Sequence, residues 1–325
     1  MKSYKSTKTI KGIQKGSLDT YTLFIEKGFD VLSLLGNLNF IVPISITSSD
    51  SLTGIHRLLE NNCAEIKISS YSVRPQPVFE NAVINTSILF FKKTGTNCEK
   101  VYATKMYRKS NNFDLQYLID NHQFIDVYDC KLVGRYPKIS LPIEKSILKK
   151  VFSQNKSIGD LILSEGAPIY YRTTGGRYYK VITPYSTGST KETVIYFEKC
   201  IQKEIGAILS SSLYFWFYQI FSNNLDLKYY EIISFKIPPD IARFSFEIKR
   251  LYDEYLVDIE KNVSVRQTKK YANIESFKEY KIGRSKKYID RIDDLIGPLY
   301  GFTNQEIDFL KNYEIDYRLS SNLEQ

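Results

Sequence analysis

The residues best suited to do chemistry in this chain lie in one short basic and aromatic segment, residues 169–182. Arg172, Arg177 and Lys180 are interleaved there with tyrosine pairs at 170–171 and 178–179. Guanidinium and ammonium groups contact nucleic-acid phosphates, and Arg can also make a two-point contact with guanine. The segment therefore predicts a surface that contacts phosphates and base edges. An ordinary exposed hairpin with tyrosines packed below it is the alternative.

A tight turn is predicted in the middle of this segment, where Thr173-Thr174-Gly175-Gly176 separates two strand-like runs. Glycine accepts a positive φ at no steric cost, so a Gly-Gly pair between such runs favours a β-hairpin. Gly-rich loops also bind phosphates in other proteins. Here no Gly-x-x-x-x-Gly-Lys-Ser/Thr pattern follows, so a nucleoside-triphosphate site is not indicated.

A second pattern, Pro239-Asp240 followed by Glu247 and Lys249, is similar to the Pro-Asp and Glu-x-Lys arrangement of metal-dependent nucleases. That chemistry needs carboxylates that converge on one magnesium ion. Residues 241–256 are expected to form one helix, on which Glu247 and Lys249 point to different sides. The pattern therefore does not predict a nuclease site.

Cysteine, histidine and clustered carboxylates do not predict a metal site. The four cysteines are far apart without a Cys-x-x-Cys pair, and the two histidines add no ligand cluster, so neither zinc nor a disulfide framework is indicated. The carboxylates Asp290, Asp293 and Asp294 are expected to form the solvated face of an amphipathic helix.

Composition limits the classes of protein to which the chain can belong. The 325 residues are 43% hydrophobic and 25% charged, which is enough for ordinary cores in two or three domains. The net charge of +9 favours polyanionic partners, although a solvated lysine-rich surface gives the same excess. The sequence shows no signal peptide and no apolar run of membrane-spanning length. We expect a cytoplasmic, reduced protein with no membrane partner.

The first hundred residues predict an alternation of helices and strands. Apolar residues at Leu23, Phe24, Val31, Leu32 and Leu35 predict an amphipathic helix over 19–35, with Asp19 near its start. A strand covered on both faces is expected over 38–44, then a helix that begins after 48–50 with Leu52, Ile55, Leu58 and Leu59 on its apolar face. Two further strands are expected over 64–71 and 83–91.

Three segments, Asp19–Glu26, Gly36–Ser45 and Val78–Phe91, together resemble the gamma-type adenine-N6 DNA methyltransferases of type IIG restriction-modification enzymes. The resemblance implies an α/β fold, in which a partial Rossmann-like methyltransferase sheet precedes an α+β target-recognition domain and C-terminal helices. It implies double-stranded DNA as the partner. It also implies that Phe79 forms a wall of the pocket for the flipped adenine, where a ring offsets part of the cost of unstacking a base.

On this resemblance, the family's catalytic half is expected to be absent from these 325 residues. In the family, Asn-Pro-Pro-Tyr holds the target adenine and a Gly-rich turn holds S-adenosylmethionine. The nearest tetrad here, Ile237-Pro238-Pro239-Asp240, lacks both the leading polar residue and the trailing aromatic residue, and we reject it as catalytic. On this resemblance, Met1 falls within or just beyond the loop after the tetrad. We therefore expect no catalytic residue here and S-adenosylmethionine only in a complete assembly.

The remaining blocks resemble the rest of such enzymes. Residues 169–182 and 207–239 are similar to the target-recognition domain, and residues 285–318 are similar to the C-terminal end. The expected domains are 1–100, the C-terminal half of the methyltransferase domain, 101–240, the target-recognition domain, and 241–325, a helical segment. The residues expected to bind DNA are Arg172, Thr174, Gly175, Gly176, Arg177, Tyr178, Tyr179 and Lys180.

Three hypotheses follow. In the first, the chain is half of a split adenine methyltransferase and needs a protein partner that carries the N-terminal half, because an inner strand without neighbours exposes unpaired backbone groups. In the second, the chain is a catalytically inactive DNA-binding specificity module. In the third, it is the remnant of a truncated gene.

Overall fold

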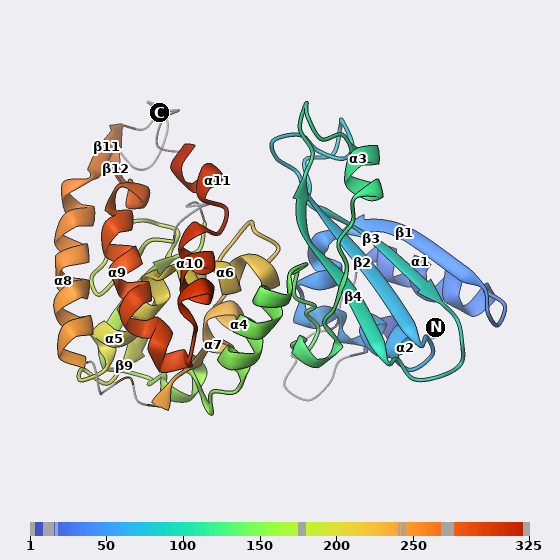
Figure 1. Cartoon of the computed structure of the whole chain (residues 1–325), viewed down its shortest axis with the longest axis horizontal. Coiled ribbons are helices and arrows are strands. Elements are labelled where there is room, and N and C mark those ends of the chain that lie inside the picture. The colour runs from blue at the N-terminus through green and yellow to red at the C-terminus, as the bar shows by residue number, and fades with distance from the viewer. Residues whose placement is uncertain are drawn as a thin grey trace. The chain divides into compact units, whose positions relative to one another are not determined.

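The protein is described by a computed structural model that covers residues 4–8, 16, 19–174, 180–239, 241, 245–267 and 276–320. The chain forms two compact units (Figure 1), one of residues 1–148 with 220–223 and one of residues 149–219 with 224–325. The domain boundaries expected near residues 100 and 240 stay a prediction. We describe each unit by itself.

The first unit is built on a mixed five-stranded sheet with the order β1-β3-β2-β4-β5. Strand β3 is antiparallel to both of its neighbours, β4 is parallel to β2, and β5 is antiparallel to β4. The strands are β1 (Asn37–Pro43), β2 (Glu65–Ser72), β3 (Thr86–Lys92), β4 (Lys100–Arg108) and β5 (Ile125–Asp126). The helices are α1 (Thr20–Val31), α2 (Thr53–Glu60) and α3 (Leu115–Asp120). The predicted order of helix, strand, helix, strand, strand is confirmed by α1 to β3, and β4 and β5 extend the sheet beyond it.

Helix α2 buries the predicted face, but α1 does not. Leu52, Ile55, Leu58 and Leu59 are all buried. In α1 the buried residues are Thr22, Ile25, Glu26 and Phe29, so the predicted apolar stripe was wrong. The reason is that the Glu26 carboxylate accepts hydrogen bonds from the backbone N–H groups of Lys5 at 2.9 Å and Ser6 at 2.7 Å, which keeps a polar residue on the buried face of α1.

Strand β1 lies at an edge of the sheet and is less covered than predicted. Only Val42 is buried along it, and Ile41 is 49% exposed. The predicted strand covered on both faces is therefore wrong for β1 in this chain. Phe24 and Val31 of the preceding helix are 69% and 73% exposed, and Leu34 and Leu35 after it are exposed as well. The exposed apolar side chains of α1 and the open edge of β1 thus belong to two consecutive elements of the first unit.

The second unit has a helical core with three small sheets. Its helices are α5 (Gln202–Ser210), α6 (Ser212–Phe221), α7 (Tyr229–Ile233), α8 (Ser245–Lys261), α9 (Lys286–Ile296), α10 (Asn304–Asn312) and α11 (Ile315–Ser320), and α4 (Pro142–Phe152) leads into it. One sheet has the order β8-β7-β9, and the pairs β6–β10 and β11–β12 form the others. These strands are β6 (Lys156–Ser157), β7 (Ala167–Arg172), β8 (Ile182–Thr183), β9 (Glu192–Phe197), β10 (Lys236–Ile237), β11 (Val263–Gln267) and β12 (Ser276–Tyr280).

Two local predictions in this unit are confirmed. Helix α6 is core, with Trp216 fully buried. Helix α10 begins at a capping box, in which the Thr303 hydroxyl accepts from the Glu306 N–H and the Glu306 carboxylate accepts from the Thr303 N–H. Both follow from local rules, because an all-round apolar helix is buried and a Thr-x-x-Glu pattern caps a helix.

The expectation of a solvated carboxylate face on α9 was wrong for Asp293. This residue is 2% exposed and accepts hydrogen bonds from the backbone N–H groups of Ser212 at 3.0 Å and Leu213 at 3.3 Å. It therefore satisfies donors at the N-terminus of α6, where the helix dipole also favours an anion. Asp290 and Asp294 do lie toward solvent and pair with Lys286 and Lys311. Within the described part of the chain, no helix is long and apolar enough to cross a membrane.

Candidate functional site

The predicted basic hairpin begins at Arg172, the last residue of β7. Strand β7 pairs antiparallel with β8, Tyr170 opposite Thr183 and Tyr171 opposite Ile182, which confirms two antiparallel strands on either side of the predicted turn. Gly175, Gly176, Arg177, Tyr178 and Tyr179 lie outside the described residues. Their assignment to DNA contact stays a prediction, as does that of Thr174, which is half-buried at the end of the described part of the turn.

The Arg172 guanidinium is held by groups of its own unit. Its Nε and Nη2 atoms donate to the Thr187 hydroxyl at 3.3 and 3.1 Å, and Nη2 donates to the Lys278 carbonyl at 3.0 Å. The guanidinium also lies over the Tyr280 ring, 5.4 Å from its centroid. Arg172 therefore joins the end of β7 to strand β12, and it fixes the start of the predicted reading turn.

A carboxylate stands at the same junction. The Glu260 carboxylate, at the end of α8, accepts from the hydroxyls of Tyr185 at 2.9 Å and Tyr280 at 2.6 Å, and from the Lys278 ammonium at 3.2 Å. Burial raises the pKa of Glu260, but these hydrogen bonds outweigh burial and hold its pKa below the ordinary value. The cluster ties α8, the β7-β8-β9 sheet and the β11–β12 hairpin together.

Lys180 lies inside the unit rather than on its surface. Its side chain is 7% exposed, and the ammonium lies over the Tyr218 ring, 4.2 Å from the centroid. Burial lowers the pKa of Lys180 to about 8, and the charges of Glu231 and Asp226 act in the opposite direction. In this position Lys180 supports the exit of the turn, and its predicted contact with DNA stays untested.

Phe79 lies in the segment 73–85, which joins the end of β2 to β3 (Figure 1). The ends of this segment are tied by the Asn85 amide oxygen, which accepts from the Val73 N–H at 2.7 Å. Val78 packs against the cluster of Tyr71, Tyr107 and Leu118, and its neighbour Phe79 is 46% exposed. Packing of Val78 therefore fixes this part of the segment, while the exposed Phe79 ring is accessible to a planar group.

The ends of the parallel strands β2 and β4 gather aromatic and polar groups that sequence analysis did not single out. The Tyr71 hydroxyl and His122 Nε2 lie 2.6 Å apart, and the His122 and Tyr107 rings are 5.4 Å apart. Burial lowers the pKa of His122, which favours the neutral imidazole. In open α/β sheets, ligands bind at the carboxyl ends of the parallel strands. The sequence does not show that β2 pairs with β4, so this group of side chains is found only in the structure.

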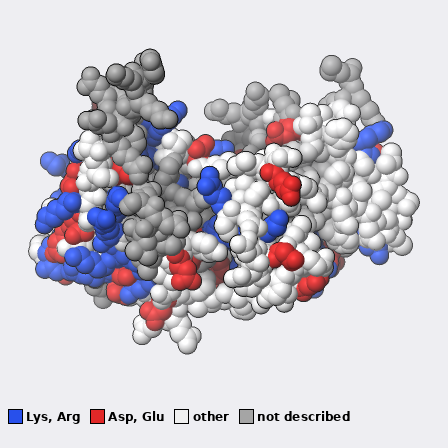
Figure 2. Space-filling model, turned by 90° about the horizontal axis from the view of Figure 1, so that it is seen from above, with Lys and Arg blue, Asp and Glu red and all other residues white. Residues whose placement is uncertain are grey.

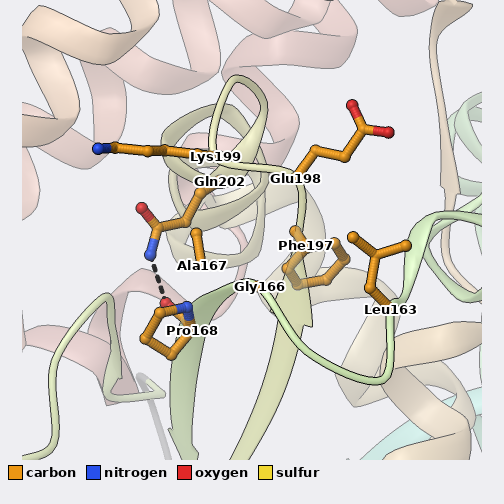
Figure 3. A pocket seen from close by; sticks show the side chains of 8 residues that line it. All are labelled: Leu163, Gly166, Ala167, Pro168, Phe197, Glu198, Lys199 and Gln202. Atoms are coloured by element: carbon orange, nitrogen blue, oxygen red, sulfur yellow. Dashed lines mark hydrogen bonds between the residues drawn. The ribbon is translucent and has the colours of Figure 1, made fainter.

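A hollow of about 510 Å³ lies at the far end of the β7-β8-β9 sheet from Arg172 (Figure 3). It is lined by Leu163, Gly166, Ala167, Pro168, Phe197, Glu198, Lys199 and Gln202. The Gln202 amide donates to the Pro168 carbonyl, and the charged ends of Glu198 and Lys199 point away from each other. The hollow therefore brings together no catalytic set.

Two residues of the nuclease-like pattern lie on one helix. Glu247 and Lys249 both lie on α8, as predicted, and the Lys249 ammonium pairs with Glu204 at 3.2 Å. Asp240 lies outside the described residues. Across the described ranges, no group of three His, Cys, Asp or Glu side chains could hold a metal ion.

Charge is mixed on the face that Figure 2 presents. Figure 2 shows Lys and Arg side chains interspersed with Asp and Glu on the face that it presents. The overall positive charge of the chain therefore does not mark a binding site by itself.

The comparisons with known proteins found a partial match to a restriction enzyme. The type II restriction enzyme and methyltransferase RM.Eco57I of Escherichia coli is 25% identical over 161 residues, which are 50% of this chain and 15% of that enzyme. Over part of its length the chain is distantly similar to a restriction-modification enzyme. It spans a small part of the length of that relative. No protein family model matches the sequence.

The matches among solved structures include two complexes with DNA. The cryoEM structure of a DrdV–DNA complex is 16% identical, with a TM-score of 0.30, over 35% of this chain and 13% of that one. The ATP-dependent Type ISP restriction-modification enzyme LlaBIII bound to DNA is 14% identical, with a TM-score of 0.32, over 53% of this chain and 12% of that one.

Proposed function

We propose that the chain is the DNA-recognition half of a site-specific adenine-N6 DNA methyltransferase of a restriction-modification system. A partner polypeptide supplies the S-adenosylmethionine site and the catalytic tetrad. The first unit then provides the closing half of the methyltransferase sheet and the Phe79 wall of the base pocket. The second unit provides the turn that reads DNA.

The observation that carries the proposal is the open edge of β1. The other side of this strand pairs with β3, and within the described part of the chain no strand pairs with its free side. A free strand edge offers a row of backbone donors and acceptors, and proteins normally shield such an edge. A strand of the partner polypeptide satisfies these groups and continues the sheet.

The apolar surface beside this edge supports the same arrangement. Ile41 on β1, Phe24 and Val31 on α1, and Leu34 and Leu35 after α1 are all exposed. Contiguous exposed apolar side chains mark interaction surfaces, because their burial contributes about 25 cal/mol per Å². Burial of these side chains and pairing of β1 are both expected when the partner half docks.

The proposal places the methyl-donor site in the partner polypeptide. The resemblance associates S-adenosylmethionine with a Gly-rich turn, whereas the segments 73–85 after β2 and 109–114 after β4 contain no glycine. Strand β1 is followed directly by a short 3-10 helix, Ile44–Thr47. We therefore assign no methyl-donor contact to the residues of this chain.

The proposal is tested by complementation. The chain is mixed with a polypeptide that carries a Gly-rich turn and Asn-Pro-Pro-Tyr, encoded upstream in the same genome, and transfer of tritiated methyl groups from S-adenosylmethionine to duplex DNA is measured. We expect transfer by the mixture and none by either polypeptide alone. An inactive mixture whose components do not associate contradicts the split-enzyme proposal.

A matched pair of variants tests the docking surface. Ile41→Lys places a charge beside the open edge and is expected to weaken association at least about tenfold, which corresponds to 1.4 kcal/mol. Phe246→Lys changes an exposed apolar side chain on α8 of the second unit, 75% exposed, and is expected to leave association unchanged. The DNA-binding specificity module is favoured instead if the chain binds DNA selectively and no partner restores transfer.

A further inference from the structure

Basic residues are concentrated in one segment of the second unit. Residues 261–287 contain nine Lys and Arg and two Glu, a net charge of +7, whereas the whole chain carries +9. The other 298 residues are therefore close to neutral. This segment comprises the β11–β12 hairpin, the short 3-10 helix Ile282–Ser285 and the start of α9.

The two ends of the hairpin are held together at its base. The Lys281 N–H donates to the Asn262 carbonyl at 3.4 Å, and the Arg284 N–H donates to the Lys281 carbonyl at 3.0 Å. Ile282, Gly283 and Ser285 are buried. Arg284 is therefore the residue of the 3-10 helix that faces solvent. We call Lys261, Lys281 and Arg284 the ribbon foot; Lys261 is also exposed, and Lys281 is half-buried.

The ribbon foot belongs to the same junction as the turn predicted to read DNA. Arg172, which begins that turn, donates to the Lys278 carbonyl of β12, three residues before Lys281. The next residue, Thr173, donates its N–H to the Lys191 carbonyl at 2.8 Å, and Lys191 is exposed. The start of the turn at Arg172 and Thr173 and the described part of the β11–β12 pair thus lie at neighbouring positions.

Acidic groups at this junction are already engaged. Glu260 accepts from Tyr185, Tyr280 and Lys278. Glu192 accepts from the hydroxyls of Ser186 and Thr187, and Glu279 accepts from the Ser264 hydroxyl. These carboxylates reduce the local positive potential, but they are directed into the junction, whereas Arg284 and Lys261 are exposed.

We propose that the ribbon foot contacts the phosphate backbone of duplex DNA beside the bases read by the turn 173–179. This inference rests on the proposed DNA-recognition function and deepens it. Phosphate contacts fix the position of a protein on DNA without carrying sequence information, so the ribbon foot supplies affinity and register while the turn supplies selectivity. Each Lys or Arg that neutralises a phosphate releases condensed counterions on binding.

The double variant Lys281→Gln, Arg284→Gln tests the proposal, with Lys199→Gln, Lys203→Gln as the matched control. Lys199 and Lys203 follow β9 at the end of the sheet where Ala167 pairs with Phe197, opposite the end where Arg172 pairs with Glu192. Affinity of the full chain for a duplex is measured from 50 to 300 mM salt. Circular dichroism checks that all variants unfold at temperatures close to that of the wild type.

We expect the slope of log K against log salt to fall by about 1.8 in magnitude for the ribbon-foot variant, since each lost phosphate contact removes about 0.9. The preference between duplex sequences stays unchanged, and the control variant keeps the wild-type slope. Wild-type binding with the same slope in the ribbon-foot variant overturns this inference alone. A wild-type chain that does not bind duplex DNA overturns the proposed recognition function as well.

Discussion

The Arg172 guanidinium donates a 3.0 Å hydrogen bond to the carbonyl of Lys278, 106 residues further along the chain. This bond joins the strand that leads into the predicted reading turn to the basic β11–β12 hairpin. Two elements far apart in the sequence therefore start from one junction, and Arg172 acts there as a residue that positions both.

Arg172→Ala is expected to destabilise this junction. The change removes the hydrogen bonds to the Thr187 hydroxyl and the Lys278 carbonyl, and bonds to charged groups contribute about 1.5–3 kcal/mol each when buried. Because Arg172 is half-exposed, we expect a loss of about 1–2 kcal/mol in the free energy of unfolding in urea. Hydrogen exchange of the Tyr280 amide is expected to become faster. An unchanged exchange rate contradicts the positioning role.

Glu260→Gln is expected to flatten the acid limb of the stability curve. Hydrogen bonds hold the pKa of Glu260 below its ordinary value of 4.5 against the effect of burial. A carboxyl with a depressed folded pKa stabilises the protein above its unfolded pKa, and this contribution is lost as the pH falls through the folded pKa. Urea unfolding between pH 3 and pH 7 measures this. The wild type should lose more stability than the variant below the ordinary pKa, and parallel curves would count against the cluster.

Phe79→Ala is expected to impair methyl transfer by the complemented enzyme without unfolding the chain. Stacking on an aromatic ring contributes about 1–3 kcal/mol per base, so we expect a loss of roughly 10- to 100-fold in the transfer rate. The readout specific to base flipping is the fluorescence of 2-aminopurine placed at the target adenine. Val83→Ala, in the same segment and 80% exposed, is the control and should leave both measurements unchanged. Equal effects of the two variants contradict the pocket-wall role.

Asp293 is expected to give stability the opposite pH dependence. Burial raises the pKa of Asp293 to about 6, and the contacts with Ser212, Arg318 and Leu213 act against burial. The folded chain therefore binds a proton more tightly than the unfolded chain, so this contribution is full below about pH 4 and falls as the pH rises through 6. A shift of two units corresponds to about 3 kcal/mol. Unfolding of Asp293→Asn should lack this fall, and a variant that keeps it would show that another group titrates.

Local sequence rules predicted the helices and strands better than they predicted which side chains are buried. The Thr303 cap, the buried helix around Trp216 and the antiparallel pairing of β7 with β8 each depend on residues close together in the sequence. The buried face of α1 could not be predicted, because the Glu26 carboxylate accepts from the N–H groups of Lys5 and Ser6 some 20 residues away. A charged residue at a helix surface is normally solvated, and the sequence carries no signal of that contact.

Only those residues of the candidate site that belong to a recognisable sequence pattern could be predicted. The tyrosine and arginine pattern led to Arg172, and the family resemblance led to Phe79. The sequence did not show that Arg172 joins Lys278, nor that Lys180 turns inward onto Tyr218. The concentration of charge in residues 261–287 was present in the sequence and could have been found by computing net charge in windows. Its placement next to Arg172 required the structure.

Selection of duplexes from a random pool tests whether this chain recognises a specific DNA site. The isolated chain is incubated with random double-stranded DNA at about 150 mM salt, a concentration at which weak non-specific contacts are largely screened, and the bound molecules are sequenced. We expect enrichment of a short motif with an adenine at a fixed position, and loss of this enrichment in the Arg177→Ala variant. Bound DNA without any enriched sequence, or no bound DNA, would contradict a role in site-specific DNA recognition.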